Sequence, residues 1–350
     1  MTSLAETAAW LVDIPSVTGD EIAIVEAVAR RLEGMDEHRV GRSLVVGRPT
    51  GGPMILLVGH LDTVPSQGQG PATIVDGKLH GLGSADMKGG LAVIIHLLED
   101  RDVVAGPYSV VGIFYDGEEG PADGNGLGQL LDETGWLTDA EFAVVLEPSD
   151  GQIQVGCNGS INAAVTFAGR SSHSARPWWG ENAVTKAGEW LAEMHRREPE
   201  LHSIDGLEYR EVMSVTMAAG GIARNVIPDR FELNLNYRFS PDRSVDDAIA
   251  VVRKAATGAD SVDIVDVAPA GPVSVSHPFV GRLAGAASAE LAAKQGWTDV
   301  ARLGQYGIPA VNFGPGQATE AHQRDEYVAI SQIEQTFTAL RRALTEDPVQ

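Results

Sequence analysis

The first half of the chain alternates short, continuously apolar runs with segments in which apolar residues recur at a helical spacing. Continuous apolar runs of this length are typical of strands that are buried on both faces of a parallel sheet. The alternation therefore predicts an α/β core, with a mostly parallel sheet flanked by helices on both faces. The expected strands are Met54–Gly59, Tyr108–Tyr115 and Glu141–Leu146, and the expected helices are Gly89–Asp100 and Leu127–Glu133.

The middle of the chain has a different pattern, in which polar and apolar residues alternate. Ser160–Ala168 shows this period of two, and Phe231–Phe239 shows it more clearly. Such a period predicts antiparallel strands with one open face. Helical stretches are expected at Asn182–Arg197 and Val245–Thr257. Together these elements suit a small two-layer α+β domain.

The last part of the chain returns to alternating helices and strands. We expect a helix at Gly281–Gln295, a short strand at Ala310–Phe313 and a closing helix at Ile330–Thr345. An insertion therefore interrupts the core domain. The predicted domains are a discontinuous core of residues 1–157 and 267–350 and an inserted α+β domain of residues 158–266.

Length and composition narrow the class of protein. The 350 residues are 43% hydrophobic, which is enough for a sizeable core in more than one domain. The sequence contains no uncharged apolar run long enough to span a membrane. The segment Met1–Asp13 lacks the basic residues that begin a secretory signal peptide, so we expect a cytoplasmic protein. A single cysteine, Cys157, excludes an intramolecular disulfide and a cysteine-based zinc site.

The charge balance restricts the partners. Lys and Arg total 26 against 48 Asp and Glu, which gives a formal net charge of −22. A field of this sign repels phosphate backbones and argues against nucleic-acid binding. An anionic substrate therefore needs local arginines or metal ions that reverse the field.

Histidines and carboxylates gather in five segments that follow strand-like runs or occupy glycine-rich loops. Sites in open α/β sheets form at the carboxyl ends of strands, so these segments are expected to converge. Imidazole and carboxylate without sulfur suit Zn²⁺ or a similar divalent ion. Each segment alone also fits a simpler interpretation, such as a core histidine or solvated loop acids. The segments are Gly59–Pro65, Gly81–Gly90, Asp116–Gly120, Glu147–Ser149 and Ala321–Glu326.

The motifs GHLDTVP, GSADMKGG, GEEG, EPS and AHQRDE, in this order and at these separations, resemble the aminoacylase/carboxypeptidase-type dizinc metallopeptidase family. The resemblance implies a zinc exopeptidase-like core and an inserted dimerisation and lid domain. It also implies two Zn²⁺ per subunit, with Co²⁺ able to substitute. The implied roles are Asp86 as bridging ligand, His60 and Glu147 at one ion, Glu119 and His322 at the other, Asp62 orienting His60, Glu118 as general acid/base, and a cis peptide after Asp86.

The resemblance further implies hydrolysis of a small anionic N-acyl amino acid by a homodimer. Segments around Ser172–Trp178, Asn225–Asp229 and Tyr237–Val245 are similar to the branch of the family that acts on N-succinyl-LL-diaminopimelate. Acetylornithine deacetylases, aminoacylases and dipeptidases share much of the pattern, so those substrates stay open. A non-catalytic metal-binding relative is disfavoured, because Glu118 and every expected ligand are present.

Several residues outside the ligand motifs are candidates for substrate contacts. By the resemblance, His173 is expected to reach the site from the partner subunit and to stabilise the oxyanion. Arginine can hold a carboxylate with two hydrogen bonds, although a surface ion pair is the alternative for each. The remaining candidates are Arg176, Arg238, the weaker Arg224, Asn225, Thr298 and Gly314, whose missing side chain would let backbone approach substrate.

Overall fold

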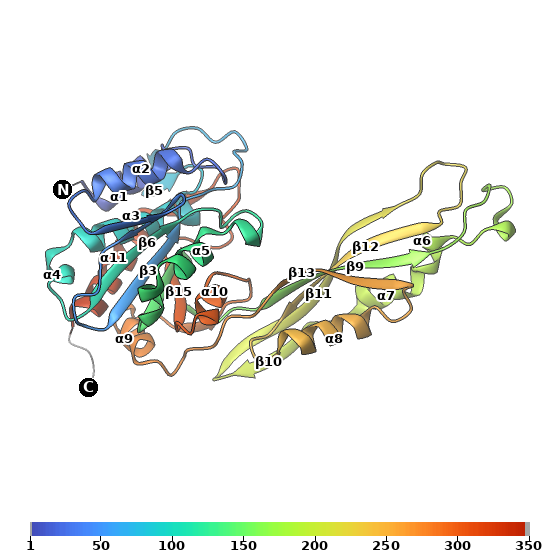
Figure 1. The fold of residues 1–350 in the computed structure, drawn as a ribbon. Helices are drawn as coiled ribbons and strands as arrows, with labels where there is room; N and C mark the ends of the chain where they lie inside the picture. Colours follow the sequence, from blue (N-terminus) through green and yellow to red (C-terminus); the bar gives the residue numbers. More distant parts are fainter. Residues whose placement is uncertain (1, 347–350) are drawn as a thin grey trace. The chain divides into compact units, whose positions relative to one another are not determined.

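The computed structural model describes residues 2–346, apart from the side chain of Ala122, and the chain forms two compact units (Figure 1). The first unit contains the chain up to Val155, Ser274–Ala292 and the chain from Arg302 onward. The second contains Gly156–Val273 and Ala293–Ala301. The predicted core of residues 1–157 and 267–350 includes residues 267–273 and Ala293–Ala301, both of which belong to the second unit.

An eight-stranded sheet forms the centre of the first unit. Its strands are β1 (Glu37–Val40), β2 (Ser43–Val46), β3 (Met54–His60), β6 (Ser109–Tyr115), β7 (Phe142–Pro148), β8 (Ile153–Val155), β14 (Leu291–Ala293) and β15 (Ala310–Gly314). Their order is β1-β2-β6-β3-β7-β15-β8-β14. The four central strands are parallel, whereas β2 and β8 pair antiparallel with β6 and β15. The predicted mostly parallel sheet is confirmed.

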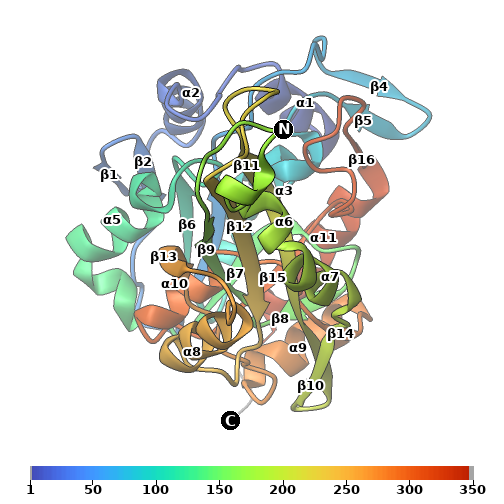
Figure 2. The ribbon, with the colours of Figure 1, turned by 90° about the vertical axis from the view of Figure 1, so that its right-hand side faces the viewer.

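Helices cover both faces of this sheet. The helices are α1 (Leu4–Val12), α2 (Ile22–Arg31), α3 (Gly89–Glu99), α4 (Arg101–Val104), α5 (Gly126–Glu133), α9 (Pro278–Ala287), α10 (Val300–Gln305) and α11 (Ile330–Thr345). Figures 1 and 2 show α3 and α11 on one face and α5 on the other. Within residues 2–346, no helix is long and apolar enough to cross a membrane.

The prediction of a helix at Gly281–Gln295 was wrong in its second half. It ends at Ala287 because Ser288 adopts a left-handed conformation, with φ of 52°. The following residues then enter β14 at the edge of the sheet.

A small three-stranded sheet brings together two loops of the first unit. It contains β4 (Thr73–Val75), β5 (Lys78–His80) and β16 (Tyr327–Ala329), in the order β16-β5-β4. Tyr327 pairs with His80, so the segment before β16 lies next to the segment after β5. That second segment continues into a single irregular turn, η1 (Ser84–Lys88), ahead of α3.

The second unit is a two-layer α+β domain, as predicted. Its antiparallel strands are β9 (Gly159–Ala168), β10 (Glu200–Ile204), β11 (Leu207–Gly220), β12 (Arg230–Phe239) and β13 (Ser261–Ala268), in the order β10-β11-β12-β9-β13. Alternate residues of β12 are buried against a core shared with α6 (Ala183–Lys186), α7 (Gly188–Arg196) and α8 (Val245–Ala255). The single helix expected at Asn182–Arg197 is two helices, and β10 was not predicted.

Candidate metal centre

The centre forms where three parallel strands of the first unit end. His60 is the last residue of β3, Glu147 lies near the end of β7, and Glu119 follows β6. Every residue of β3 is buried. The position before the histidine requires glycine, because a Cβ at Gly59 would lie 2.7 Å from the side chain of Leu91 and 2.8 Å from that of Met87. Close packing of β3 on α3 and η1 therefore fixes His60 beside η1.

His60, Asp86 and Glu147 form the first group of potential ligands. His60 Nε2 lies 3.1 Å from Asp86 Oδ1 and 3.6 Å from Glu147 Oε1. The His60 side chain is fully buried, and the carboxylates of Asp86 and Glu147 are nearly so. The peptide bond between Asp86 and Met87 is cis, as the resemblance implied.

His322, Glu119 and Asp86 form the second group. His322 Nε2 lies 2.8 Å from Glu119 Oε1 and 3.3 Å from Asp86 Oδ2. The His322 side chain is 50% exposed, in contrast to His60. Asp86 thus turns one carboxylate oxygen towards each histidine, which is the arrangement that a bridging ligand requires.

The geometry and the donor atoms fit two zinc ions. Zinc holds nitrogen and oxygen ligands at about 2.0–2.1 Å, so two ligand atoms of one tetrahedral ion lie roughly 3.3 Å apart. The separations between potential ligand atoms in the two groups, 2.8–3.6 Å, bracket that value. The donors are imidazole nitrogens and carboxylate oxygens without sulfur, a set that zinc accepts.

The charges of the centre favour a cation. Burial alone would lower the pKa of His60, but its contacts with Asp62 and Asp86 outweigh burial and raise that pKa well above its ordinary value. Contacts with Asp86 and Glu119 raise the pKa of His322 to about 10. Burial favours the neutral acid at Asp86, yet His322 and His60 hold its pKa below the ordinary range. A metal ion that binds here must displace protons from both imidazoles.

Asp62 contacts more than the histidine that it was expected to orient. Its carbonyl oxygen lies 3.0 Å from His60 Nδ1, closer than its carboxylate at 3.5 Å. The carboxylate accepts hydrogen bonds from the backbone N–H of Glu118 at 3.0 Å and of Glu119 at 3.1 Å, and from the Thr18 hydroxyl at 2.8 Å. Asp62 therefore fixes the loop that carries the expected base as well as a ligand.

Glu118 lies beside the ligands. A carboxylate oxygen of Glu118 lies within 4.8 Å of ligand atoms of both His60 and Glu119. The residue is partly buried and directly precedes a ligand in the chain. This position suits a group that exchanges protons with a reactant held at the centre.

Two buried charged residues near the centre were missed from the sequence. Glu326 accepts hydrogen bonds from the backbone N–H groups of Gly83, Ala85 and Asp86. Burial raises the pKa of Glu326 to about 7, although these N–H groups oppose the shift. Lys88 donates to the carbonyl of Ile14 at 2.8 Å, and burial lowers its pKa to about 8. The only sequence signal for Glu326 was its place in the His322 motif.

Three of the candidate substrate residues lie together in the second unit. The Ser174 N–H donates to the Asn225 carbonyl at 2.9 Å, and the Arg176 N–H donates to the His173 carbonyl at 2.8 Å. His173 also forms a β-bridge with Val226. His173, Arg176 and Asn225 are all exposed; His173 Nδ1 accepts from the Ala175 N–H at 3.1 Å, and the Arg176 guanidinium lies 4.9 Å from the Trp179 ring centroid.

Arg238 lies far from that group within the same unit. The Asn225 segment precedes the first residue of β12, Arg230, whereas Arg238 is the ninth residue of this strand and pairs with Ser160. At about 3.3 Å per residue, Arg238 lies roughly 26 Å from the start of the strand.

Thr298 is buried, and its carbonyl accepts a contact from Cys157 Sγ at 3.7 Å.

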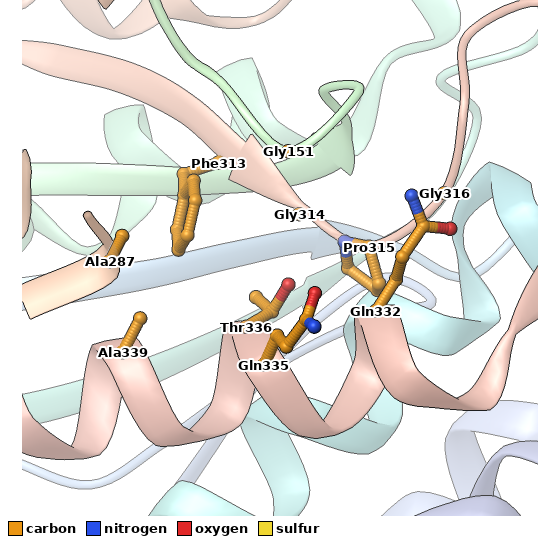
Figure 3. A pocket seen from close by; sticks show the side chains of 10 residues that line it. All are labelled: Gly151, Ala287, Phe313, Gly314, Pro315, Gly316, Gln332, Gln335, Thr336 and Ala339. Carbon is orange, nitrogen blue, oxygen red and sulfur yellow. The ribbon is translucent and has the colours of Figure 1, made fainter. Parts of the chain in front are cut away.

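Gly314 is required for packing. The Ser149 hydroxyl donates to the Gly314 carbonyl at 3.0 Å and lies 3.3 Å from the Gly314 N–H, so both backbone groups already have a partner. A Cβ at Gly314 would lie 2.0 Å from the Leu146 carbonyl. Gly314 also borders a cavity of about 330 Å³ between β15 and α11, which Phe313 and Thr336 line and none of the five ligands reaches (Figure 3).

Comparisons with known proteins agree with this architecture. The model of peptidase family M20/M25/M40 matches residues 56–346. A Mycobacterium tuberculosis relative named as a succinyl-diaminopimelate desuccinylase is 40% identical over 347 residues, or 97% of both chains. The succinyl-diaminopimelate desuccinylase of Corynebacterium glutamicum is 35% identical and covers 96% of this chain and 94% of its own. The structure of a Staphylococcus aureus tripeptidase has the same fold, with a TM-score of 0.80 at 21% identity and coverage of 98% and 97%. The resemblance found in the motifs is thus confirmed, and the chain belongs to peptidase family M20/M25/M40.

Proposed function

We propose that this protein is a zinc-dependent hydrolase of the amide bond of N-succinyl-LL-2,6-diaminopimelate. Its products would be LL-2,6-diaminopimelate and succinate, in the biosynthesis of diaminopimelate and lysine in the cytoplasm. The observation that carries the proposal is the shared position of Asp86 between two histidine–carboxylate groups, with Glu118 beside them. The names of relatives at 40% and 35% identity over nearly the whole chain support the choice of substrate.

The five ligands would hold two zinc ions, one at His60, Glu147 and Asp86 and one at Glu119, His322 and Asp86. Bound zinc supplies Lewis-acid chemistry, which makes water more acidic and polarises an amide carbonyl. Cobalt, whose coordination preferences are similar, is expected to substitute.

Glu118 would move the proton. Its carboxylate oxygen takes a proton from the attacking water and gives it to the amide nitrogen, so the C–N bond breaks with an amine as the leaving group. Asp62 supports this role because it holds the Glu118 N–H at 3.0 Å and thereby fixes the direction of the side chain. Glu118 is again a carboxylate after one turnover.

The substrate is anionic, and the candidate arginines would supply the opposite charge. Arg176 and Arg238 can each hold a carboxylate, with Asn225 and Thr298 as further polar contacts. His173 would donate a hydrogen bond to the amide oxygen as negative charge develops there. For Gly314 we propose a supporting role only, since Ser149 occupies its backbone groups.

We further infer that the active form is a homodimer formed through the inserted unit. His173 pairs with Val226, which precedes β12, and Arg238 lies eight residues after the first residue of that strand, a span of roughly 26 Å at about 3.3 Å per residue. This span is long for a single small substrate, which supports the use of two copies of the second unit. A site that uses both draws one of them from a second chain.

Turnover of N-succinyl-LL-diaminopimelate by zinc-loaded protein, beside N-acetylornithine and with an EDTA control, tests the proposal. We expect fast, EDTA-sensitive release of succinate and little deacetylation. Preference for N-acetylornithine would keep the centre and its chemistry but reject the substrate. Hydrolysis of neither compound by protein that binds two zinc ions would reject the proposed function.

A further inference from the structure

The carboxylate of Glu326 is buried among backbone N–H groups of the loop that leads to Asp86. The residue is 2% exposed and lies four positions after the ligand His322. Its Oε2 accepts from the Gly83 N–H at 3.0 Å, and its Oε1 accepts from the N–H groups of Ala85 at 2.9 Å and Asp86 at 3.1 Å. One side chain thus binds three of the four N–H groups between Gly83 and Asp86.

These hydrogen bonds connect segments that carry ligands of both metal groups. Glu326 belongs to the segment of His322, and its three donors belong to the segment of Asp86. The backbone links the same segments, because the Gly81 N–H donates to the Glu326 carbonyl at 3.2 Å and β16 pairs with β5. Backbone pairing sets the register of the two segments, and the Glu326 carboxylate fixes the turn from Gly83 to Asp86.

The hydrogen bonds of Glu326 point to a role in metal binding. Hydrogen bonds from N–H groups to a carboxylate are stronger than those to a neutral acceptor. Because these donors belong to the turn that ends at Asp86, the Glu326 carboxylate holds the backbone of the proposed bridging ligand in place.

We propose that Glu326 is a positioning residue for the bridging ligand Asp86, and that its carboxylate sets the affinity of the centre for metal. The inference rests on the proposed function only in requiring that the centre binds zinc. Outer partners of metal ligands change metal affinity by about 10–100-fold when they are removed. Glu326 acts through the backbone of Asp86 and takes no direct part in the proposed reaction.

The test compares zinc affinity in the full-length protein and in Glu326→Gln and Glu326→Ala, by competition with a chromophoric chelator. Glutamine keeps the shape but turns an NH₂ donor towards an N–H group that needs an acceptor. We expect zinc binding weaker by about 10–100-fold in both variants. Asp100→Asn is the matched control, because the Asp100 carboxylate also accepts from backbone N–H groups, those of Asp102 at 2.9 Å and Val103 at 3.2 Å, away from the centre. Its zinc affinity should equal that of the wild type.

A purely structural role for Glu326 predicts a different result. It would lower the melting temperature of the metal-free protein and leave zinc affinity within twofold of wild type, and that outcome overturns the inference. Glu326→Gln carries the test if Glu326→Ala does not fold. Weaker zinc binding in a protein that cleaves neither N-acyl substrate would support the inference while rejecting the proposed function.

Discussion

The carboxylate of Asp62 accepts the backbone N–H of Glu118 at 3.0 Å, while the Asp62 carbonyl lies 3.0 Å from His60 Nδ1. One residue therefore orients a metal ligand and the proposed proton carrier together. The Glu119 N–H at 3.1 Å adds a ligand from the second metal group to the same carboxylate. Disturbing Asp62 should consequently affect both metal binding and proton transfer.

Asp62→Asn should lower kcat by about 100-fold and weaken zinc binding, because the amide NH₂ faces an N–H group in place of an acceptor oxygen. Steady-state kinetics with zinc titration measures both effects. Thr18→Val is the matched control, since it removes one hydrogen bond of 2.8 Å to the same carboxylate and leaves its charge in place. A wild-type kcat in Asp62→Asn would contradict the assigned role.

Glu118→Gln should retain both zinc ions and lose activity by about 10²–10⁴-fold, the usual contribution of a general acid/base. The amide cannot take the proton from water, but it preserves the size of the side chain. Metal content by mass spectrometry and turnover on one preparation separate the two effects. Asp123→Asn, an exposed acid after the same strand, should remain fully active. Hydrolysis by Glu118→Gln at the wild-type rate would show that another group moves the proton.

Local pattern was sufficient for the elements that position the centre. The apolar run of β3 and the alternation along β12 are properties of consecutive residues, so both strands could be predicted within one residue of their ends. The five potential ligands could be named from the sequence because each ends a strand or lies in a motif shared with a family. The end of α9 could not, because it depends on the left-handed conformation of Ser288.

The roles of Glu326 and Gly314 were beyond prediction for a different reason. Glu326 binds N–H groups that are about 240 residues away in sequence, and backbone donors leave no mark on side-chain identity. The motif predicts that Gly314 lets backbone approach substrate, and nothing in the local sequence indicates that the Leu146 carbonyl of the adjacent strand lies beside it. In both positions the deciding contact is between the residue and distant backbone.

The two metal ions should bind with unequal affinity. His60 is fully buried at the end of a strand, whereas the side chain of His322 is 50% exposed on a loop. Ordering an exposed loop side chain costs conformational entropy that a buried strand residue has already lost on folding. Dialysis against increasing chelator should therefore remove one ion per chain well before the other.

His322→Ala should keep about one tightly bound zinc ion per chain, because His60, Glu147 and Asp86 remain. His60→Ala removes a buried ligand and should reduce the affinity of the tighter ion. Release of both ions at the same chelator concentration in the wild type would contradict the inequality.

His96 should make the first unit less stable at acid pH. Its Nε2 lies 2.8 Å from the Thr7 hydroxyl, and its ring packs edge-on against Phe337. Burial lowers the pKa of His96 below 6.5, with Glu99 and Arg31 acting in opposite directions. The unfolded chain therefore binds a proton at a higher pH than the folded chain, so stability falls as the pH drops through 6.5.

Urea unfolding of zinc-loaded protein at pH 7.5 and 5.5 measures this effect. His96→Gln should lose less stability between the two pH values than the wild type does. His38→Gln, at an exposed position on β1, should behave as the wild type. An equal loss in His96→Gln and the wild type would assign the acid sensitivity to other groups.

Mixing two inactive variants tests whether His173 acts on the site of a partner subunit. His173→Ala and Glu118→Gln chains are unfolded together, refolded at equal concentration and assayed for succinate release. If His173 acts across the dimer, each mixed dimer has one intact site, and random pairing recovers about a quarter of the wild-type activity. If His173 acts within its own chain, neither site of a mixed dimer holds both residues, and the mixture stays inactive. Refolding His173→Ala alone is the control. Because His173 pairs with Val226 before β12 and Arg238 lies near the end of that strand, recovery would also indicate which chain supplies each group to the substrate.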